Sequence, residues 1–597
     1  MDEIGGENKM KSYICLNQRK INTYPQKETL FRPHKKYPEY MYEETSEQND
    51  IYDMIRETMY MLGLDKENYD TVMWNPLKEI VIPGNTVLIK PNMVLHINDS
   101  QCGEDCLYTN PSLVAVMIEY SWLALKGQGK IVVGDAPLQE CNFEMLITQS
   151  GYKDMIDYYI SKGVNIELVD FRNVKTYEKD GLHYLQSKEE KKGVIVRLDE
   201  NSAFSGLSQD RINNLRITNY DPRILQKHHS KSKHEYNVSK YVLDADVIIN
   251  MPKPKTHRKA GVTIALKNLV GINANKEYLP HHTIGSIEEG GDSYSTKNNY
   301  LKRANEVLDM KNELMHDGDM ELAAIADKLY DSLLNKGIEQ ENERYWEGSW
   351  FGNDTIWRTI TDLNRILMYV DKRGAIQKTH QRKVFIVGDM IVSGQKEGPL
   401  EPVPIYPGVI AMGFDSLFFD RVVCSVMGFD YKKIPSLYAK ELLKRDLTIS
   451  NSEEYEIVSN NKEWNGRTCE YIVQNSSLKF EPTMGWIDKI GNKYREDLIR
   501  SLQSNEKKSV YVFGTGVNGI YAYRELKKNG ITINGFFDNN STTWDKIVID
   551  DIKCYNPSLI NENCAVVVAT RDRYLCELKT QIENKKGFYV GTINRGC

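Results

Sequence analysis

The sequence contains no apolar run long enough to cross a bilayer as a helix. Its most apolar stretches, residues 87–90, 131–133 and 566–569, are each only a few residues long and are typical of buried strands. The first residues, Met1 to Ile4, also lack the basic start and apolar segment of a signal peptide. From these absences we expect a cytoplasmic protein with no membrane insertion.

Cysteine is scarce and scattered, with ten residues in 597. Cys424, Cys564 and Cys576 fall inside predicted strands or helices, which indicates reduced thiols rather than a disulfide framework. Cys102 and Cys106 form the one close pair. An iron–sulfur cluster normally needs about four thiolates, so we expect this pair to lie in an unliganded loop and do not expect a cluster.

Basic residues are not in excess, because 77 Lys and Arg face 83 Asp and Glu, and the net charge of −6 is spread along the chain. This balance argues against a nucleic-acid partner. The length predicts three or four structural units at roughly 150 residues each. The oligomeric state does not follow from composition.

Predicted strands and helices alternate along most of the chain, which indicates a multidomain α/β fold with a parallel-rich sheet. Residues 1–80 are polar and predict an N-terminal extension packed on the main domain. Residues 81–430 predict an α/β domain with a helical insertion near 284–345, and residues 431–505 a mixed connector. Within the insertion, apolar residues recur on one face, which predicts a packing helix; they are Leu322, Ile325, Ala326, Leu329, Leu333 and Leu334.

Residues 506–597 predict a small Rossmann-like domain. A strand leads directly into Gly514, Gly516 and Gly519 in the spacing G-x-G-x-x-G, a helix follows, and the next strand ends at Asp538. Such glycines let a phosphate approach the helix N-terminus, and the acid is placed for a ribose hydroxyl. The site therefore predicts a nucleotide or nucleotide sugar, with a degenerate structural copy as the alternative. The domain resembles the Rossmann-like domains attached to sugar-modifying enzymes of bacterial surface-glycan pathways.

Three segments of the central domain follow predicted strands and carry polar side chains. Because ligand sites of open α/β sheets form at the carboxyl ends of strands, these segments are candidates for one site. The predicted substrate-binding residues are Lys90, Asn92, Lys253, Lys255 and Asn268, where the lysines suit a phosphate or carboxylate. The predicted catalytic residues are His257, Lys267, His281, Asp135 and Asp389, of which the histidines suit proton transfer. The alternative is an ordinary solvated basic loop.

A tryptophan-rich segment at residues 346–358 is a further candidate for substrate binding. Trp357 and Arg358 lie beside Asp354, and aromatic faces next to charged groups suit a sugar ring or a base. Alternatively, Trp357 and Ile360 form the buried side of a helix that begins near Asp354.

From about residue 81 to 485 the chain is similar to the DUF362 family. The resemblance is carried by residues 87–92, residues 253–271, and Gly398 to Leu400 together with residues 413–415 and Asp420. It implies a fold and a site but no reaction, since the family's activity is not generally established. Some members are fused to ferredoxin segments, whereas this sequence has no C-x-x-C-x-x-C run.

Three functions remain open. The first is an enzyme that acts on an anionic small molecule, for which a nucleotide sugar or another precursor in polysaccharide biosynthesis is the leading candidate. The second is a metal-dependent redox or racemase/epimerase-type enzyme, with His257, His281 and His282 as ligands. The third is a non-catalytic nucleotide-sensing or scaffold protein. Clustered titratable groups at strand ends favour an enzyme.

Overall fold

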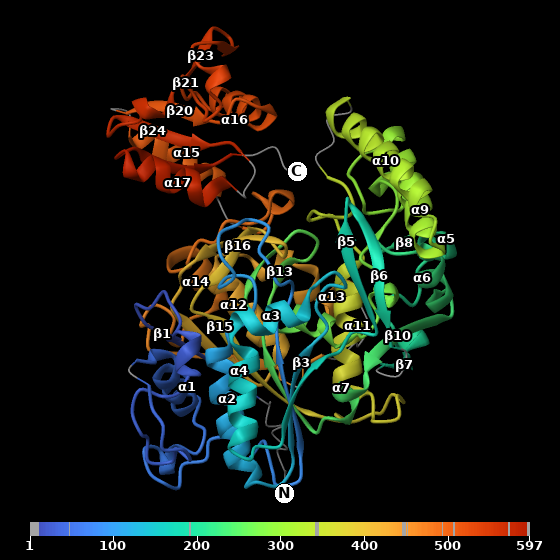
Figure 1. Cartoon of the computed structure of the whole chain (residues 1–597), viewed down its shortest axis with the longest axis vertical. Helices are drawn as coiled ribbons and strands as arrows, with labels where there is room; N and C mark the ends of the chain where they lie inside the picture. The colour runs from blue at the N-terminus through green and yellow to red at the C-terminus, as the bar shows by residue number, and fades with distance from the viewer. Residues whose placement is uncertain are drawn as a thin grey trace, which may run out of the picture.

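A large central sheet organises most of the chain. The computed structural model describes residues 11–593 except 47, 190–192, 341–344, 444–448, 451, 492–493, 506–507 and 571–573. Eight strands lie in the order β19-β1-β18-β15-β11-β2-β3-β4 (Figure 1). They are β19 (Glu454–Ser459), β1 (Lys11–Gln18), β18 (Val409–Gly413), β15 (Lys383–Met390), β11 (Val247–Met251), β2 (Thr86–Pro91), β3 (Lys130–Asp135) and β4 (Ile166–Asp170). The pairs from β15 to β4 are all parallel, which confirms the expected multidomain α/β fold with a parallel-rich sheet.

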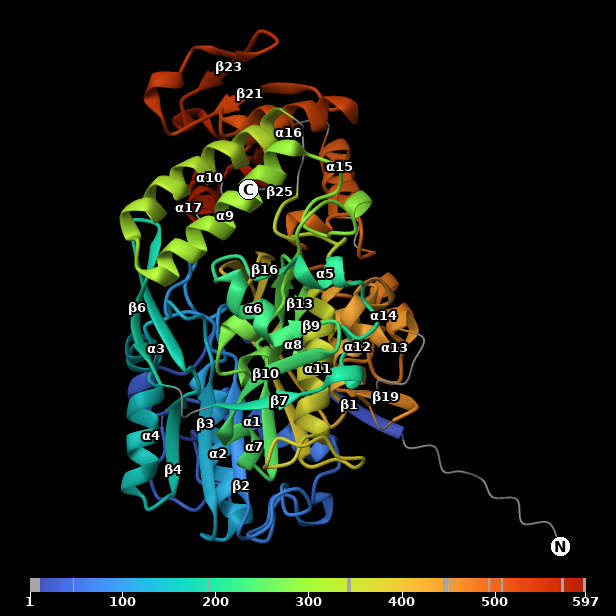
Figure 2. The same cartoon turned by 90° about the vertical axis from the view of Figure 1, so that its right-hand side faces the viewer.

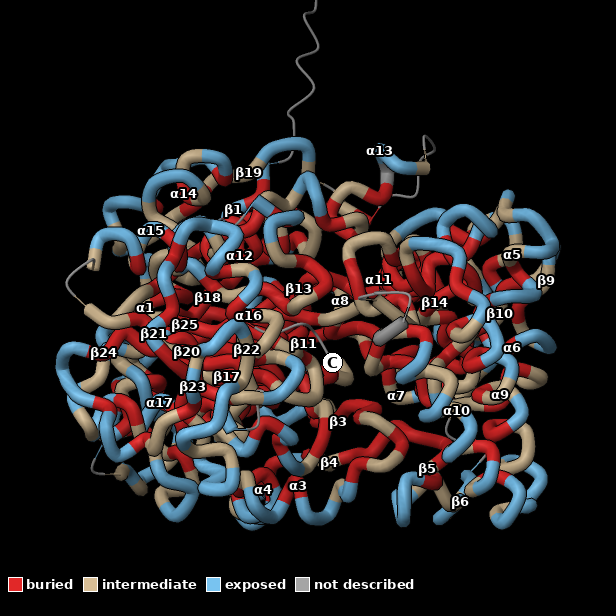
Figure 3. The backbone as a smooth tube through the Cα atoms, turned by 90° about the horizontal axis from the view of Figure 1, so that it is seen from above, coloured by how far each residue is buried: buried red, intermediate tan, exposed pale blue. Residues whose placement is uncertain are grey.

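Successive residues of the central strands enter two separate hydrophobic cores. Val87 and Ile89 of β2 pack in one core, and Leu88 between them packs in the other. Side chains alternate across a strand, so strands that are apolar at successive positions are buried on both faces. Figure 3 shows these central strands as buried tube within a more exposed periphery.

Helices cover both faces of the sheet. One face packs against α1 (Asp50–Met61), α2 (Pro111–Leu125), α3 (Phe143–Ser150) and α4 (Tyr152–Ser161). The other packs against α7 (Lys240–Asp244), α8 (Ala265–Asn268), α11 (Ile356–Tyr369), α12 (Ser416–Met427) and α14 (Cys469–Asn475). Asn110 caps α2 through its side chain, and Pro111 stands in the first turn, where its missing N–H costs nothing.

The two ends of the main domain are part of the sheet itself. Strand β1 lies between β18, to which it is antiparallel, and β19, to which it is parallel. The N-terminal segment, expected as an extension, and the connector, expected as a mixed region, therefore each contribute a strand. The sequence around β1 is polar and shows little of the pattern of a strand. The strand is buried by its neighbours β18 and β19, which lie almost 400 residues away or more in the sequence.

Smaller sheets lie beside the carboxyl ends of the central strands. One joins β13 (Gly261–Thr263), β12 (Lys255–His257), β16 (Ser393–Glu397) and β17 (Glu401–Ile405). Others join β7 (Gly193–Arg197), β10 (Lys233–Ser239) and β9 (His229–Ser230), and also β14 (His282–Thr283) with β8 (Leu215–Arg216). Short helices α5 (Gln209–Asn213), α6 (Pro222–His228) and α13 (Ala439–Leu443) connect them.

The helical insertion forms a hairpin of α9 (Asn299–Asp317) and α10 (Met320–Gln340), with the strand pair β5 (Val174–Lys179) and β6 (Leu182–Lys188) beside it (Figure 2). The predicted packing face of α10 is only partly covered. Ala323 and Ala326 are buried, but Leu322, Ile325 and Leu329 are at least half exposed. The small side chains are therefore the buried ones, while Leu333 and Leu334 are half-buried.

The last unit has its own six-stranded sheet, in the order β22-β23-β21-β20-β24-β25. Its strands are β22 (Ile547–Ile549), β23 (Ile552–Tyr555), β21 (Ile533–Phe537), β20 (Ser509–Phe513), β24 (Cys564–Val568) and β25 (Phe588–Thr592), and its helices are α15 (Tyr494–Ser504), α16 (Val517–Lys528) and α17 (Leu575–Asn584). It projects from the same side of the main domain as the α9–α10 hairpin (Figures 1 and 2). A disulfide joins Cys102 of the main domain to Cys576 of α17. This corrects the expectation that these thiols are reduced; a partner 474 residues away leaves no spacing signal in the sequence.

Candidate functional site

A cleft of about 300 Å³ lies where the strands β2, β3 and β11 end. Its walls come from the segment after β2, the segment after β3, the β12–β13 hairpin, helix α8 and the turn before β14. These elements are distant in sequence but meet here because parallel neighbours place their carboxyl ends at one edge of a sheet.

Most of the predicted site residues line this cleft. They are Asn92, Asp135, Lys255, His257, Lys267, Asn268 and His281. Lys90 lies directly beneath, where its ammonium group is 2.7 Å from Oδ1 of Asp135 and donates to Oδ1 of Asn268 at 3.2 Å. The structure thus brings together Lys90 and Asn92 at the end of β2, Asp135 at the end of β3, and predicted site residues between Lys255 and His281.

Asp135 is held firmly at the base of the cleft. Its Oδ2 accepts a hydrogen bond from the backbone N–H of Met93 at 2.7 Å, and its Oδ1 accepts one from Ala136 at 2.9 Å. A Cβ atom on Gly271 would lie 1.9 Å from Oδ1 of Asp135 and 2.9 Å from Nζ of Lys90. The missing side chain of Gly271 therefore makes room for the Lys90–Asp135 pair.

Lysine side chains dominate the charge of the cleft. Lys255 donates to Oδ1 of Asn92 at 2.8 Å and to the carbonyl of Leu107, and Lys276 donates to the carbonyl of Ala136 at 2.7 Å. Burial, together with neighbouring cations, lowers the pKa of Lys255 and of Lys276 to about 7. Such lysines readily exchange a proton near neutral pH.

Lys267 differs from these two lysines. It is carried by α8, whose first turn is fixed by Asp420, which accepts hydrogen bonds from the N–H groups of Ala265 and Leu266 at 2.8 and 2.9 Å. Within the part of the chain that the structure describes, the ammonium group of Lys267 makes no hydrogen bond or ion pair with protein. Burial and then the charge of Lys90 lower its pKa to about 8.

Two of the histidines that line the cleft, His257 and His281, have complementary tautomers. The backbone N–H groups of Lys259 and Ala260 both donate to Nδ1 of His257 at 3.1 Å, so the ring proton of neutral His257 lies on Nε2. Nδ1 of His281 lies 2.6 Å from the carbonyl oxygen of Leu279, so this nitrogen carries the proton and Nε2 has a free lone pair. Burial and then the charge of Lys267 lower both pKa values, that of His281 to about 3.

Two further polar groups line the cleft without a partner. Nε2 of Gln139 and Oγ1 of Thr263 are buried and make no hydrogen bond with the described protein atoms. Buried polar atoms are nearly always satisfied, and both residues line the cleft.

Lys253 and Asp389 do not lie at the cleft. They form a fully buried ion pair, 2.6 Å between Nζ and Oδ2, and Tyr24 donates to Oδ1 of Asp389 at 2.6 Å. Strand β11 has β2 on one side and β15 on the other, and Lys253 turns toward the β15 side. Neither residue lines the cleft, so the structure does not bring them together with the other predicted site residues.

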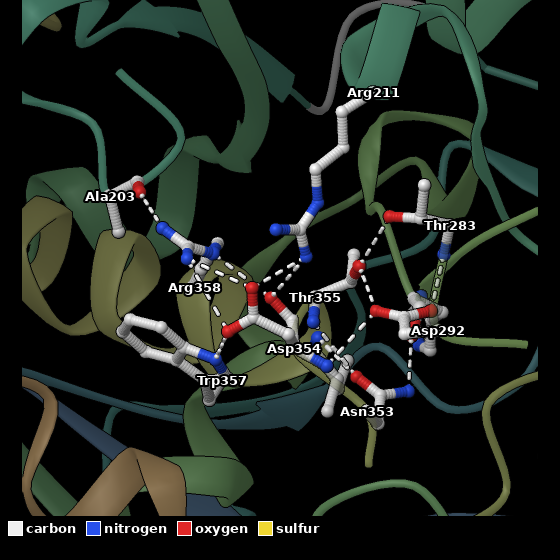
Figure 4. Close-up of polar contacts among 11 residues, drawn as sticks. Ala203, Arg211, Thr283, Asp292, Asn353, Asp354, Thr355, Trp357 and Arg358 are labelled. Atoms are coloured by element: carbon white, nitrogen blue, oxygen red, sulfur yellow. Dashed lines mark hydrogen bonds and ion pairs between the residues drawn. The ribbon is translucent and has the colours of Figure 1, made fainter. Parts of the chain in front are cut away.

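Trp357 and Arg358 also lie away from the cleft, in a closed polar network (Figure 4). Nε1 of Trp357 donates to Oδ1 of Asp354 at 2.8 Å, and Arg358 donates to the carbonyls of Asp354 and Ala203 at 2.9 and 2.7 Å. Trp357 and Ile360 are buried on α11. The alternative interpretation of this segment, as the packing side of a helix, is the one that the structure shows.

The glycine-rich loop of the last unit has the expected strand, turn and helix. Gly514 adopts a φ of 112° and donates to the carbonyl of Phe537 at 2.7 Å, and Gly519 packs closely on Gly514. Gly516 begins α16 with open space beside it. Oδ2 of Asp538 accepts hydrogen bonds from both N–H and Oγ1 of Thr515, at 2.9 and 2.7 Å, so the acid already holds the loop.

Several cleft residues were not predicted. Lys259 donates to Oγ1 of Thr218 at 3.2 Å and to the carbonyl of Glu347, and Arg258, Tyr220 and Lys276 are among the other lining residues. Lys259 continues the alternating series of Lys253, Lys255 and His257, so the spacing could have indicated it. Lys276 sits on a short 3-10 turn and has no such signal.

No group of three or more His, Cys, Asp or Glu side chains is arranged to hold a metal ion among the residues that the structure describes. His282 is buried outside the cleft, with Nδ1 3.4 Å from the ammonium of Lys259. The proposed set of His257, His281 and His282 therefore does not converge on one point.

Comparison with known proteins supports the central resemblance. Residues 200–425 match the family described as "Domain of unknown function (DUF362)". Over 196 residues, a third of this chain, the sequence is 26% identical to a thylakoid-associated protein of Synechocystis sp.. The match covers 41% of that protein's length. No helix in the described residues is long and apolar enough to span a membrane.

Proposed function

We propose that this chain is an enzyme that binds an anionic small molecule in the Lys/His cleft and transfers protons there. The observation that carries the proposal is Lys267, an ammonium group without a protein partner in a cleft that other cations already line. Lys267 is half-buried, and a partly desolvated charge without a partner gains from an opposite charge, which an anionic ligand would supply.

The charge balance of the lining supports an anion. The cations are Lys255, Arg258, Lys259, Lys267 and Lys276, and the carboxylates are Asp135, Glu140 and Glu347. Asp135 is already paired with Lys90, so the carboxylates do not neutralise the cations. Gln139 and Thr263 add uncharged groups that can orient a ligand.

The histidines support chemistry rather than simple binding. Nε2–H of His257 can donate a hydrogen bond to a ligand oxygen, and Nε2 of His281 can accept a proton. A hydrogen-bond donor and a base in one cleft can polarise a substrate and remove a proton from it.

Nucleotide sugars and other surface-glycan precursors are the first ligands to test. Their phosphates suit the lysines, and the glycine loop of the last unit offers a second place for a nucleotide. This part of the proposal depends on a resemblance in sequence, so simple phosphates and carboxylates belong in the same screen.

Thermal stabilisation of the full chain by a panel of nucleotide sugars, sugar phosphates and small carboxylates tests the proposal. We expect at least one anion to raise Tm in wild type and to lose that effect in Lys267→Met. Lys433→Met, which changes an exposed lysine outside the cleft, should keep it. If no anion raises Tm, or if every shift survives in Lys267→Met, the cleft is not the binding site.

A further inference from the structure

The lysines of the cleft differ in how their amines are engaged. Lys90 is paired with Asp135, Lys255 donates to Asn92, and Lys276 donates to Ala136. Lys259 donates to Thr218 and to the carbonyl of Glu347. Of these amines, that of Lys267 alone makes no hydrogen bond or ion pair with the described protein atoms.

The surroundings of Lys267 are those of a nucleophilic amine. Its nitrogen lies in a ligand-sized cleft near the cation Lys90, and both features favour the neutral amine, which is the form that attacks carbonyl carbon. Its charge also acts on His257, His281 and Lys255. Lys267 is therefore central among the proton-transfer groups and the other cations.

We propose that Lys267 forms a covalent imine with an anionic aldehyde or ketone, whose charged group is held by Lys255 and Lys276. This inference rests on the proposed function, since it requires an anionic ligand in the cleft. It adds the reacting atom, Nζ of Lys267, and the reacting group of the substrate, a carbonyl carbon close to a carboxylate or phosphate.

The atoms of the reaction balance without an oxidant or reductant. Nζ of neutral Lys267 attacks the carbonyl carbon: a C–N bond forms, the C=O π bond breaks, and one proton passes from nitrogen to oxygen to give a carbinolamine. Nε2 of His281 can relay this proton, and Nε2–H of His257 can donate a hydrogen bond to the oxygen. The second nitrogen-bound proton then passes to the hydroxyl group, which leaves as water as the C=N bond forms, so both protons of the amine end in the water. Hydrolysis reverses the sequence and releases the free amine.

Reductive trapping tests this directly. The full chain is incubated with glyoxylate or pyruvate, the smallest anionic aldehyde and ketone, and sodium cyanoborohydride, which transfers hydride to the imine carbon and leaves a stable secondary amine. Peptide mapping by mass spectrometry then locates the adduct. We expect labelling at Lys267 to exceed that at exposed Lys433, and the neutral acetaldehyde to lose this preference.

Matched variants separate the inference from its alternatives. Lys267→Arg stays protonated and cannot act as a nucleophile, so labelling in the cleft should fall at least about tenfold. Lys432→Arg, which changes an exposed lysine outside the cleft, should keep labelling at Lys267. An adduct at Lys267 no more frequent than at Lys433 would overturn the imine. If the imine is not found but anions still raise the Tm of wild type and not that of Lys267→Met, the proposed function stands without the imine. If anions do not raise Tm in this way, the proposed function and the imine are both wrong.

Discussion

Nζ of Lys90 lies 2.7 Å from Oδ1 of Asp135, and both side chains are buried beneath the cleft. Burial lowers the pKa of Lys90, and the nearby carboxylate of Asp135 opposes that shift. The pair joins the ends of β2 and β3, and both of its charges act on Lys267: Lys90 lowers the pKa of that amine and Asp135 raises it. A contact that looks purely structural thus also sets the electrostatics of the proposed nucleophile.

Replacing one member of this pair is expected to be costly. Lys90→Met leaves the carboxylate of Asp135 buried without its counter-ion, which should lower the free energy of unfolding by about 3–5 kcal/mol. Urea unfolding measures the loss. The double variant Lys90→Met with Asp135→Asn removes both charges and should recover part of it. If the single and double variants lost the same free energy of unfolding, the charges of Lys90 and Asp135 would not be coupled.

Gly271 should not tolerate even a methyl group. A Cβ atom there would lie 1.9 Å from Oδ1 of Asp135, so Gly271→Ala must displace the carboxylate, at a cost of roughly 1–3 kcal/mol and with loss of anion binding. Gly516→Ala is the matched control, because a Cβ on Gly516 meets nothing within 4 Å. Thermal unfolding compares the two variants, and equal Tm values would contradict the crowding at Gly271.

The convergence of the site could be predicted, but its exact membership could not. Asn92 and Asp135 follow parallel strands, so fold topology alone brings them together. Lys253 and Lys255 are two residues apart, yet one pairs with Asp389 and the other reaches Asn92. That difference depends on which neighbouring strand each side chain faces, and this information is absent from local sequence. The same holds for Trp357, whose partners are set by tertiary packing.

Stability should rise with pH because of the buried cleft lysines. Burial lowers the pKa of Lys276 to about 7 from its ordinary value of 10.5. Between these values the unfolded chain binds more protons, so the free energy of unfolding gains up to about 1.4 kcal/mol per pH unit from this group. The free energy of unfolding of wild type minus that of Lys276→Met, measured by urea unfolding, should therefore increase from pH 7 to pH 9. The corresponding difference for Lys433→Met should stay constant, and a flat result for Lys276 would mean that its amine is well solvated.

The Cys102–Cys576 disulfide should appear in a peptide map of the chain purified without reductant. It closes a separation of 474 residues between the segment after β2 and the beginning of α17, and a cross-link of this kind typically contributes about 2–4 kcal/mol. We expect one cross-linked peptide pair that disappears on reduction, and a lower Tm in Cys576→Ser. Cys106→Ser, which changes a buried free thiol of the same segment, should retain the cross-link. Alkylation of Cys102 and Cys576 in the folded, unreduced chain would show that the two thiols are not bonded. The last unit would then be held by non-covalent contacts such as the hydrogen bond that Nζ of Lys396 donates to Oγ1 of Thr592.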